Sequence, residues 1–165
     1  MVANTQKLLH QQKSAGFTYL GLLFFIAIMG ITLALASTLW SFAQQREKER
    51  ELLFIGHQFR RAIGLYYERT PGTVKKYPNR LEDLLLDNRY VTLQRYLRQI
   101  YRDPITGSRE WGLVPAPDGG VMGVYSKSEE RTIKIGNFQF GDRLLGGQRK
   151  YSEWQFVYLP QTVAK

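Results

Sequence analysis

The hydrophobic and polar positions divide this chain into an apolar part and a mixed part. No charged residue occurs from Ser14 to Gln45, and the apolar run Phe17–Ala43 exceeds the roughly 20 residues that an α-helix needs to cross a bilayer. The remaining residues, about 120, match the common size of one domain. The sequence therefore predicts a leader at 1–16, a transmembrane helix at 17–43 and a single head domain at 44–165.

A helical pattern continues beyond the apolar run. Apolar residues recur at steps of three or four up to the breakers Thr70, Pro71 and Gly72. We expect one helix from Phe17 to about Arg69, whose second half is amphipathic and packs its apolar stripe against the head. The stripe consists of Leu52, Ile55, Phe59, Ile63 and Tyr66.

The head combines short helical and strand patterns. Asn79 and Glu82 have the spacing of a capping box before a short helix, and the apolar spacing in 91–101 predicts a second helix. Alternation of Trp154, Phe156 and Tyr158 with less apolar residues predicts a strand that packs on the long helix. The predicted strands are 110–114, 121–125 and 153–159, and 135–147 is predicted to be a loop. The expected fold class is α+β.

Charge and cysteine content limit the possible functions. The formal net charge of +9 favours anionic partners, but acids alternate with bases in 46–51 and 127–131, which is typical of a solvated surface. Nucleic acid is therefore not the expected partner. The chain has no cysteine, which excludes disulfides and thiol chemistry.

Residues with catalytic or metal-binding potential are scattered. The two histidines, His10 and His57, do not form a metal-binding spacing, and Asp87 and Asp103 fit turn or cap positions. Oxygen ligands for calcium would have to come from carboxylates interspersed with bases, and we predict no metal, no cofactor and no catalytic residue. Those carboxylates are Asp118, Glu129, Glu130, Asp142 and Glu153.

The junction before the apolar run resembles a type IV prepilin signal. A basic leader ends at Gly16, Phe17 follows, and the apolar helix starts at once. The blocks YPNRLEDLL, YRDPITGSREWGLV and GVYS also resemble the head of type II secretion pseudopilins, which implies a pilin-like fold with a long helix on a small antiparallel sheet. The resemblance implies cleavage by a prepilin peptidase between Gly16 and Phe17, and methylation of the new N-terminal Phe17.

The same resemblance implies a structural function. The chain would be a single-pass inner-membrane protein with a periplasmic C-terminal domain, assembled with other pseudopilins by an inner-membrane platform into a short filament for protein secretion. Gly21 stands at the fifth mature position, where this family usually has Glu, so a minor or specialised subunit fits better than the main one. Gly30, Ala34 and Ser37 form a small-residue face for helix packing in the membrane.

Two other functions and one other orientation stay open. A minor type IV pilin for DNA uptake or adhesion would use the positive charge to bind its ligand. An unprocessed membrane anchor would retain residues 1–16. Counting Lys and Arg on both sides of 17–43 favours the opposite orientation, although long domains translocate largely regardless of charge.

Overall fold

The computed structural model describes residues 15–160, except for the side chains of 15–17, 35–39 and 140. The chain divides into a unit that ends at Gln44 and a unit that begins at Gln45, which we call the head. The predicted leader at 1–16 therefore lies almost entirely outside the described residues. The elements in order are α1 (Ala15–Glu68), η1 (Leu81–Leu84), β1 (Gly112–Pro115), β2 (Val121–Tyr125), η2 (Phe140–Leu145), η3 (Tyr151–Glu153) and β3 (Phe156–Val157), with η denoting 3₁₀-helix.

The long helix agrees with the sequence prediction. Helix α1 runs through 54 residues and ends one residue before the predicted end at Arg69. The breakers act as expected, because Pro71 cannot donate an amide hydrogen bond and Gly72 takes a φ of +85°, in the left-handed region.

A three-stranded antiparallel sheet with the order β1-β2-β3 lies in the head. Gly112 pairs with Tyr125 and Val124 pairs with Phe156, so β2 occupies the centre. The turn between β1 and β2 contains Gly119, whose φ of +83° favours glycine. The expected α+β class with a small antiparallel sheet is confirmed.

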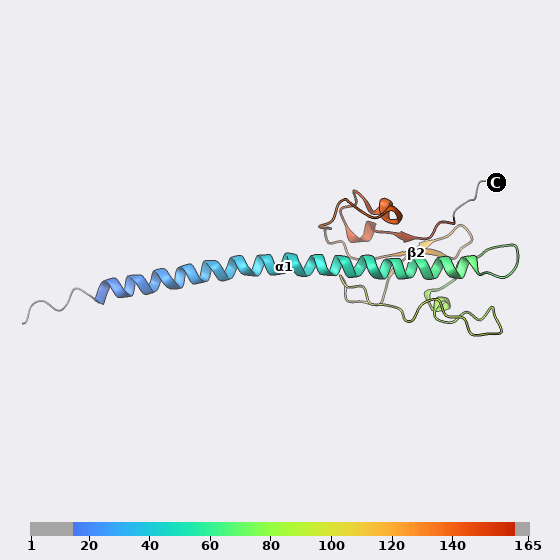
Figure 1. Cartoon of the computed structure of the whole chain (residues 1–165), viewed down its shortest axis with the longest axis horizontal. Coiled ribbons are helices and arrows are strands. Elements are labelled where there is room, and N and C mark those ends of the chain that lie inside the picture. The colour runs from blue at the N-terminus through green and yellow to red at the C-terminus, as the bar shows by residue number, and fades with distance from the viewer. Residues whose placement is uncertain (1–14, 161–165) are drawn as a thin grey trace, which may run out of the picture. The chain divides into compact units, whose positions relative to one another are not determined.

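The core of the head forms between α1 and the segments that follow it. The five stripe residues predicted to face the head are all buried, and they share one hydrophobic cluster with Trp111, Val124, Trp154 and Phe156. In Figure 1 the segments of the head lie on both sides of the C-terminal half of α1. The amphipathic pattern therefore identified the helix face around which the head is built.

The predicted helix at 91–101 was wrong. This segment is irregular, and its Leu93 is 70% exposed. The backbone N–H groups of Tyr96 and Leu97 both donate to the Leu84 carbonyl, at 2.9 and 3.0 Å, and the N–H of Asp87 donates to the Gln94 carbonyl. These longer-range hydrogen bonds replace the local ones that a helix requires.

Three smaller predictions need correction. The short helix exists as the 3₁₀-helix η1, but its N-terminal amides at Asn79 and Arg80 donate to the Asp83 carboxylate and not to Glu82. Strand β3 covers only two of the seven predicted residues, although Trp154 and Phe156 are buried on one face as expected. The predicted loop at 135–147 contains η2, which begins after Gln139.

Candidate functional site

The predicted processing and packing residues lie in the N-terminal part of α1. Gly16 and Phe17 are in its first turn, and their side chains lie outside the described residues, as does that of Ser37. A Cβ atom added to Gly21 or Gly30 would meet nothing within 4 Å, and Ala34 is exposed. These positions therefore have free space within this one chain.

Large apolar side chains are exposed along the same part of the helix. Within the residues whose side chains the structure describes, which leave out 35–39, no helix is long and apolar enough to cross a membrane. The exposed set includes Leu20, Leu22, Leu23, Phe24, Phe25, Ile26, Ile28, Met29, Ile31, Leu33, Trp40 and Phe42.

Two glycines bring α1 into close contact with β3 and the residue that follows it. A Cβ atom at Gly56 would lie 2.3 Å from the Phe156 ring, and one at Gly64 would lie 2.6 Å from the Tyr158 ring. Real Cβ atoms do not approach this closely, so only glycine permits these rings to rest on the helix backbone. The two glycines lie about two helical turns apart, and the two aromatic residues are two positions apart, so each pair lies on one side of its segment.

A buried carboxylate on α1 holds a distant part of the head. Glu49 is only 4% exposed, and its Oε1 accepts hydrogen bonds from the Ile133 amide at 2.6 Å and the Tyr151 hydroxyl at 3.0 Å. The Lys134 amide adds a longer contact of 3.3 Å. Burial, followed by the nearby Glu49 charge, raises the pKa of Tyr151, so its hydroxyl stays a donor.

A second buried carboxylate anchors η2 to the helix. The Asp142 side chain is 4% exposed and lies 2.6 Å from His57 Nε2 and 2.5 Å from Arg60 Nη2. Arg60 Nη1 also donates to the Gly141 carbonyl at 2.6 Å. This arrangement pairs the buried charge and restricts the position of η2.

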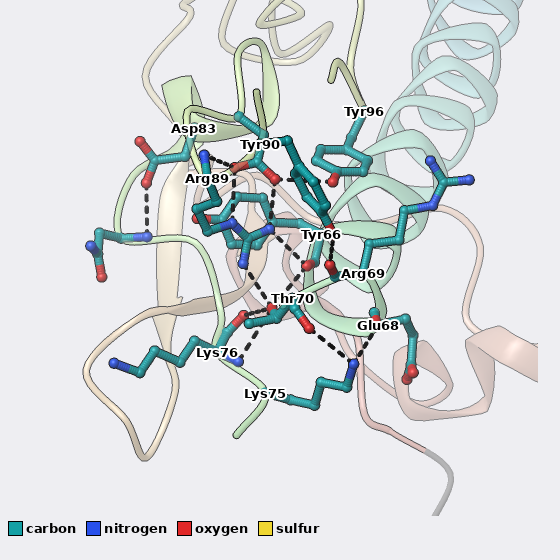
Figure 2. A network of polar contacts seen from close by, with 12 residues as sticks. Tyr66, Glu68, Arg69, Thr70, Lys75, Lys76, Asp83, Arg89, Tyr90 and Tyr96 are labelled. Atoms are coloured by element: carbon teal, nitrogen blue, oxygen red, sulfur yellow. Dashed lines mark hydrogen bonds and ion pairs between the residues drawn. The ribbon is translucent and has the colours of Figure 1, made fainter. Parts of the chain in front are cut away.

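A third network closes the C-terminal end of α1, as Figure 2 shows. The Arg89 guanidinium lies 3.5 Å from the centroid of the Tyr66 ring and donates to the Tyr66 carbonyl and the Thr70 hydroxyl. Lys75 Nζ donates to the carbonyls of Glu68 and Thr70. Cations at carbonyls that lack helical partners complement the negative end of the helix dipole.

The orientation of Arg89 depends on a buried carboxylate. Asp87 is 2% exposed and accepts hydrogen bonds from Arg89 Nε and Nη2 at 2.8 and 2.7 Å, and from the Tyr96 hydroxyl at 3.0 Å. Burial alone would raise the pKa of Asp87, but the hydrogen bonds and charge of Arg89 outweigh it and hold this pKa below its usual value. Burial and the hydrogen bond to Asp87 raise the pKa of Tyr96 to about 12.

Asp103 has a turn function, as the sequence indicated. It is fully buried and accepts hydrogen bonds from the Ile105 amide, the Thr106 hydroxyl and the Ser126 hydroxyl, the last at 2.6 Å. The backbone amide of Asp103 donates to the Ser108 carbonyl, and the Asp103 carbonyl accepts from the Gly107 amide. The buried hydrogen bond from Ser126, the residue after β2, links this turn to the end of the strand.

Four of the five carboxylates that could bind calcium have other partners, Asp142 among them. Asp118 accepts from the Tyr77 and Gly120 amides, Glu129 pairs with Lys150, and Glu153 accepts from the Arg149 and Lys150 amides. Among residues 15–160, no group of three or more His, Asp or Glu side chains is placed to hold a metal ion.

Comparisons with protein-family models, curated proteins and solved structures found no match for this chain. The networks that join α1 to the head were not anticipated from the sequence. Glu49 lies among the alternating charges of 46–51, where a solvated surface was expected. The sequence feature that could have indicated its burial is its helical spacing of three residues from Leu52. Gly56 and Gly64 could have been noticed as glycines bordering an apolar stripe.

Proposed function

We propose that this chain is a structural pseudopilin subunit of a type II secretion system. The observation that carries the proposal is the order of its parts. A prepilin-like junction at Gly16–Phe17 precedes an apolar stretch, and α1 continues from there into an amphipathic half that bears a small antiparallel sheet. The pilin-like identity of this arrangement is part of the proposal.

The head supports a mechanical function better than a chemical one. Glu49, Asp142 and the Asp87–Arg89 pair each bind groups far away in the sequence, so the segments of the head that follow α1 are attached at several points to the part of the helix within the head. A subunit that transmits force in a filament needs such a fixed connection, because a loosely attached head would yield under load. The inner-membrane position, the periplasmic head and the assembly with other pseudopilins belong to the same proposal.

The decisive experiment is the intact mass and N-terminal sequence of the protein recovered from membranes, with and without a prepilin peptidase. We expect a chain that begins at N-methyl-Phe17 only when the peptidase is present. A Gly16→Leu variant is the matched control, because it alters the residue before the cut and leaves the apolar run unchanged. A chain that still begins near Met1 in the presence of active peptidase would refute the proposal and favour an unprocessed membrane anchor.

A further inference from the structure

A basic depression lies in the head where α1 meets the segment between β2 and η2. Arg46, Glu49, Arg50 and Leu53 line it from the helix, at positions i, i+3, i+4 and i+7, and Ile133 and Lys134 close the other side. Its volume is about 280 Å³ and it is open to solvent. Three cations and two apolar side chains therefore surround one small space.

The charges in this depression are incompletely balanced. Glu49 is its lone carboxylate in the lining, and its Oε1 is already shared by two amides and the Tyr151 hydroxyl. Arg50 also pairs at 3.1 Å with Glu47, just outside the lining. Counting Glu47 and Glu49 against the three cations leaves a formal +1, which favours a singly charged anion.

The three cations come together next to the buried carboxylate of Glu49. Lys134 is 84 residues beyond Arg50, and it reaches the helix because Glu49 binds the backbone amides of Ile133 and Lys134. Lys134 Nζ also lies 4.8 Å from the centroid of the Phe138 ring, which limits its range of positions. The three cations are thus gathered by tertiary contacts despite their mutual repulsion.

We infer that this depression binds the phosphate of an anionic phospholipid headgroup. The cations would hold the phosphate, and Leu53 and Ile133 would contact the carbon atoms of the headgroup beyond the phosphate, because Leu53 is farther from Ala43 along α1 than Arg46 and Arg50. Ile135, 62% exposed, extends the apolar surface beside Lys134. The inference rests on the proposed membrane anchoring, because Arg46 follows the last residue of the expected membrane segment, Ala43, by three positions.

The test compares two variants that remove the same charge. The full chain is placed in nanodiscs of phosphatidylcholine with phosphatidylglycerol, extracted into neutral detergent, and examined by native mass spectrometry for retained lipid. The first variant is Arg46→Gln with Lys134→Gln. The control is Arg98→Gln with Arg109→Gln, which changes exposed cations outside the depression. Equal urea unfolding midpoints establish that both variants are folded.

We expect the native chain and the control variant to retain one phosphatidylglycerol in preference to phosphatidylcholine. The first variant should bind it about thirtyfold more weakly, because it removes two cations and each cation near a lipid surface contributes about 1 kcal/mol. Equal loss in both variants, or no loss in either, would overturn the inference. Complete displacement by excess inorganic phosphate would assign a free-phosphate site, and preferential binding of a polyglutamate peptide would assign a protein partner; either result also overturns it.

This outcome is separable from that of the proposed function. N-terminal cleavage is measured on the same samples by intact mass. A chain that begins at Phe17 and shows no lipid preference would refute only the lipid site. A chain that retains its leader and still binds phosphatidylglycerol through Arg46 and Lys134 would refute only the pseudopilin proposal.

Discussion

Glu49 and Tyr151 are 102 residues apart in the sequence and meet in a buried hydrogen bond of 3.0 Å. The carboxylate also accepts the amide of Ile133, so one side chain of α1 fixes two separate segments of the head. A buried acceptor that serves several donors is costly to remove, because each donor then loses its partner without gaining water.

We therefore expect Glu49→Ala to destabilise the head by about 2–4 kcal/mol, since it leaves the part-buried Ile133 amide and the buried Tyr151 hydroxyl without their acceptor. Urea unfolding of the full chain in neutral detergent, followed by tryptophan fluorescence, measures the change. Glu47→Ala is the matched control, because the Glu47 side chain is 72% exposed and pairs with an exposed arginine. Equal effects of the two substitutions would contradict a special role for Glu49.

Gly56→Ala should destabilise the fold by about 1–3 kcal/mol through overpacking against the Phe156 ring. The double variant Gly56→Ala with Phe156→Leu should show a coupling energy in a double-mutant cycle, because the smaller side chain relieves the clash. Gly136→Ala is the control, since a Cβ atom there would meet nothing within 4 Å. Purely additive effects at Gly56 and Phe156 would contradict the proposed contact.

The stability of the polar network at the C-terminal end of α1 should depend on the planar guanidinium of Arg89. Arg89→Lys keeps the positive charge but cannot bind Asp87 through two nitrogens while also stacking on Tyr66. We expect a loss of about 1–3 kcal/mol in unfolding free energy. Arg95→Lys, at an exposed residue with one long contact of 3.3 Å to a backbone carbonyl, should change it much less.

The lowered pKa of Asp87 predicts a loss of stability in acid. Because its pKa in the folded state lies below the unfolded value, the stabilisation is complete at neutral pH and declines as the pH falls below about 4 and through the folded pKa. Unfolding free energies measured from pH 6 to pH 2 should therefore fall more steeply in the native chain than in Asp87→Asn. Parallel curves would show that other carboxylates dominate.

The raised pKa of Tyr158 predicts a loss of stability in base. Burial and its hydrogen bond of 2.6 Å to Glu68 raise its pKa to about 12. The folded state keeps the proton longer than the unfolded state, so this stabilisation is present below pH 10 and is lost as the pH rises towards 12. Tyr158→Phe should flatten the stability curve in this range, and ultraviolet titration should show one fewer late-ionising tyrosine.

Gly21→Glu tests the atypical fifth position of the proposed mature chain. A Cβ atom at Gly21 meets nothing within 4 Å, so we expect the substitution to leave the fold of the subunit unchanged. If Glu at this position promotes filament assembly, as the pseudopilin resemblance implies, the variant should be recovered more often in sheared filament fractions. Unchanged incorporation alongside Gly21→Ala would show that this position does not limit assembly.

Some parts of the fold could be predicted because their information is local. The amphipathic stripe ending at Tyr66 gave the extent of α1, and alternation around Phe156 identified the buried face of β3. The strand β2 matches its predicted bounds, because two glycines end the turn before it and β-favouring residues follow. By contrast, 91–101 has helical spacing but bonds to Leu84 and Asp87, which no local pattern reveals.

The sequence by itself determined the division of the chain into an apolar helical stretch and an α+β head, since periodicity and hydrophobicity act over neighbouring residues. Only the tertiary structure decided which charges are buried. Glu49 and Asp142 resemble surface acids in the sequence, but each is enclosed by partners more than 80 residues away along the chain. A buried charge is stable only with such partners, and their positions depend on the complete fold.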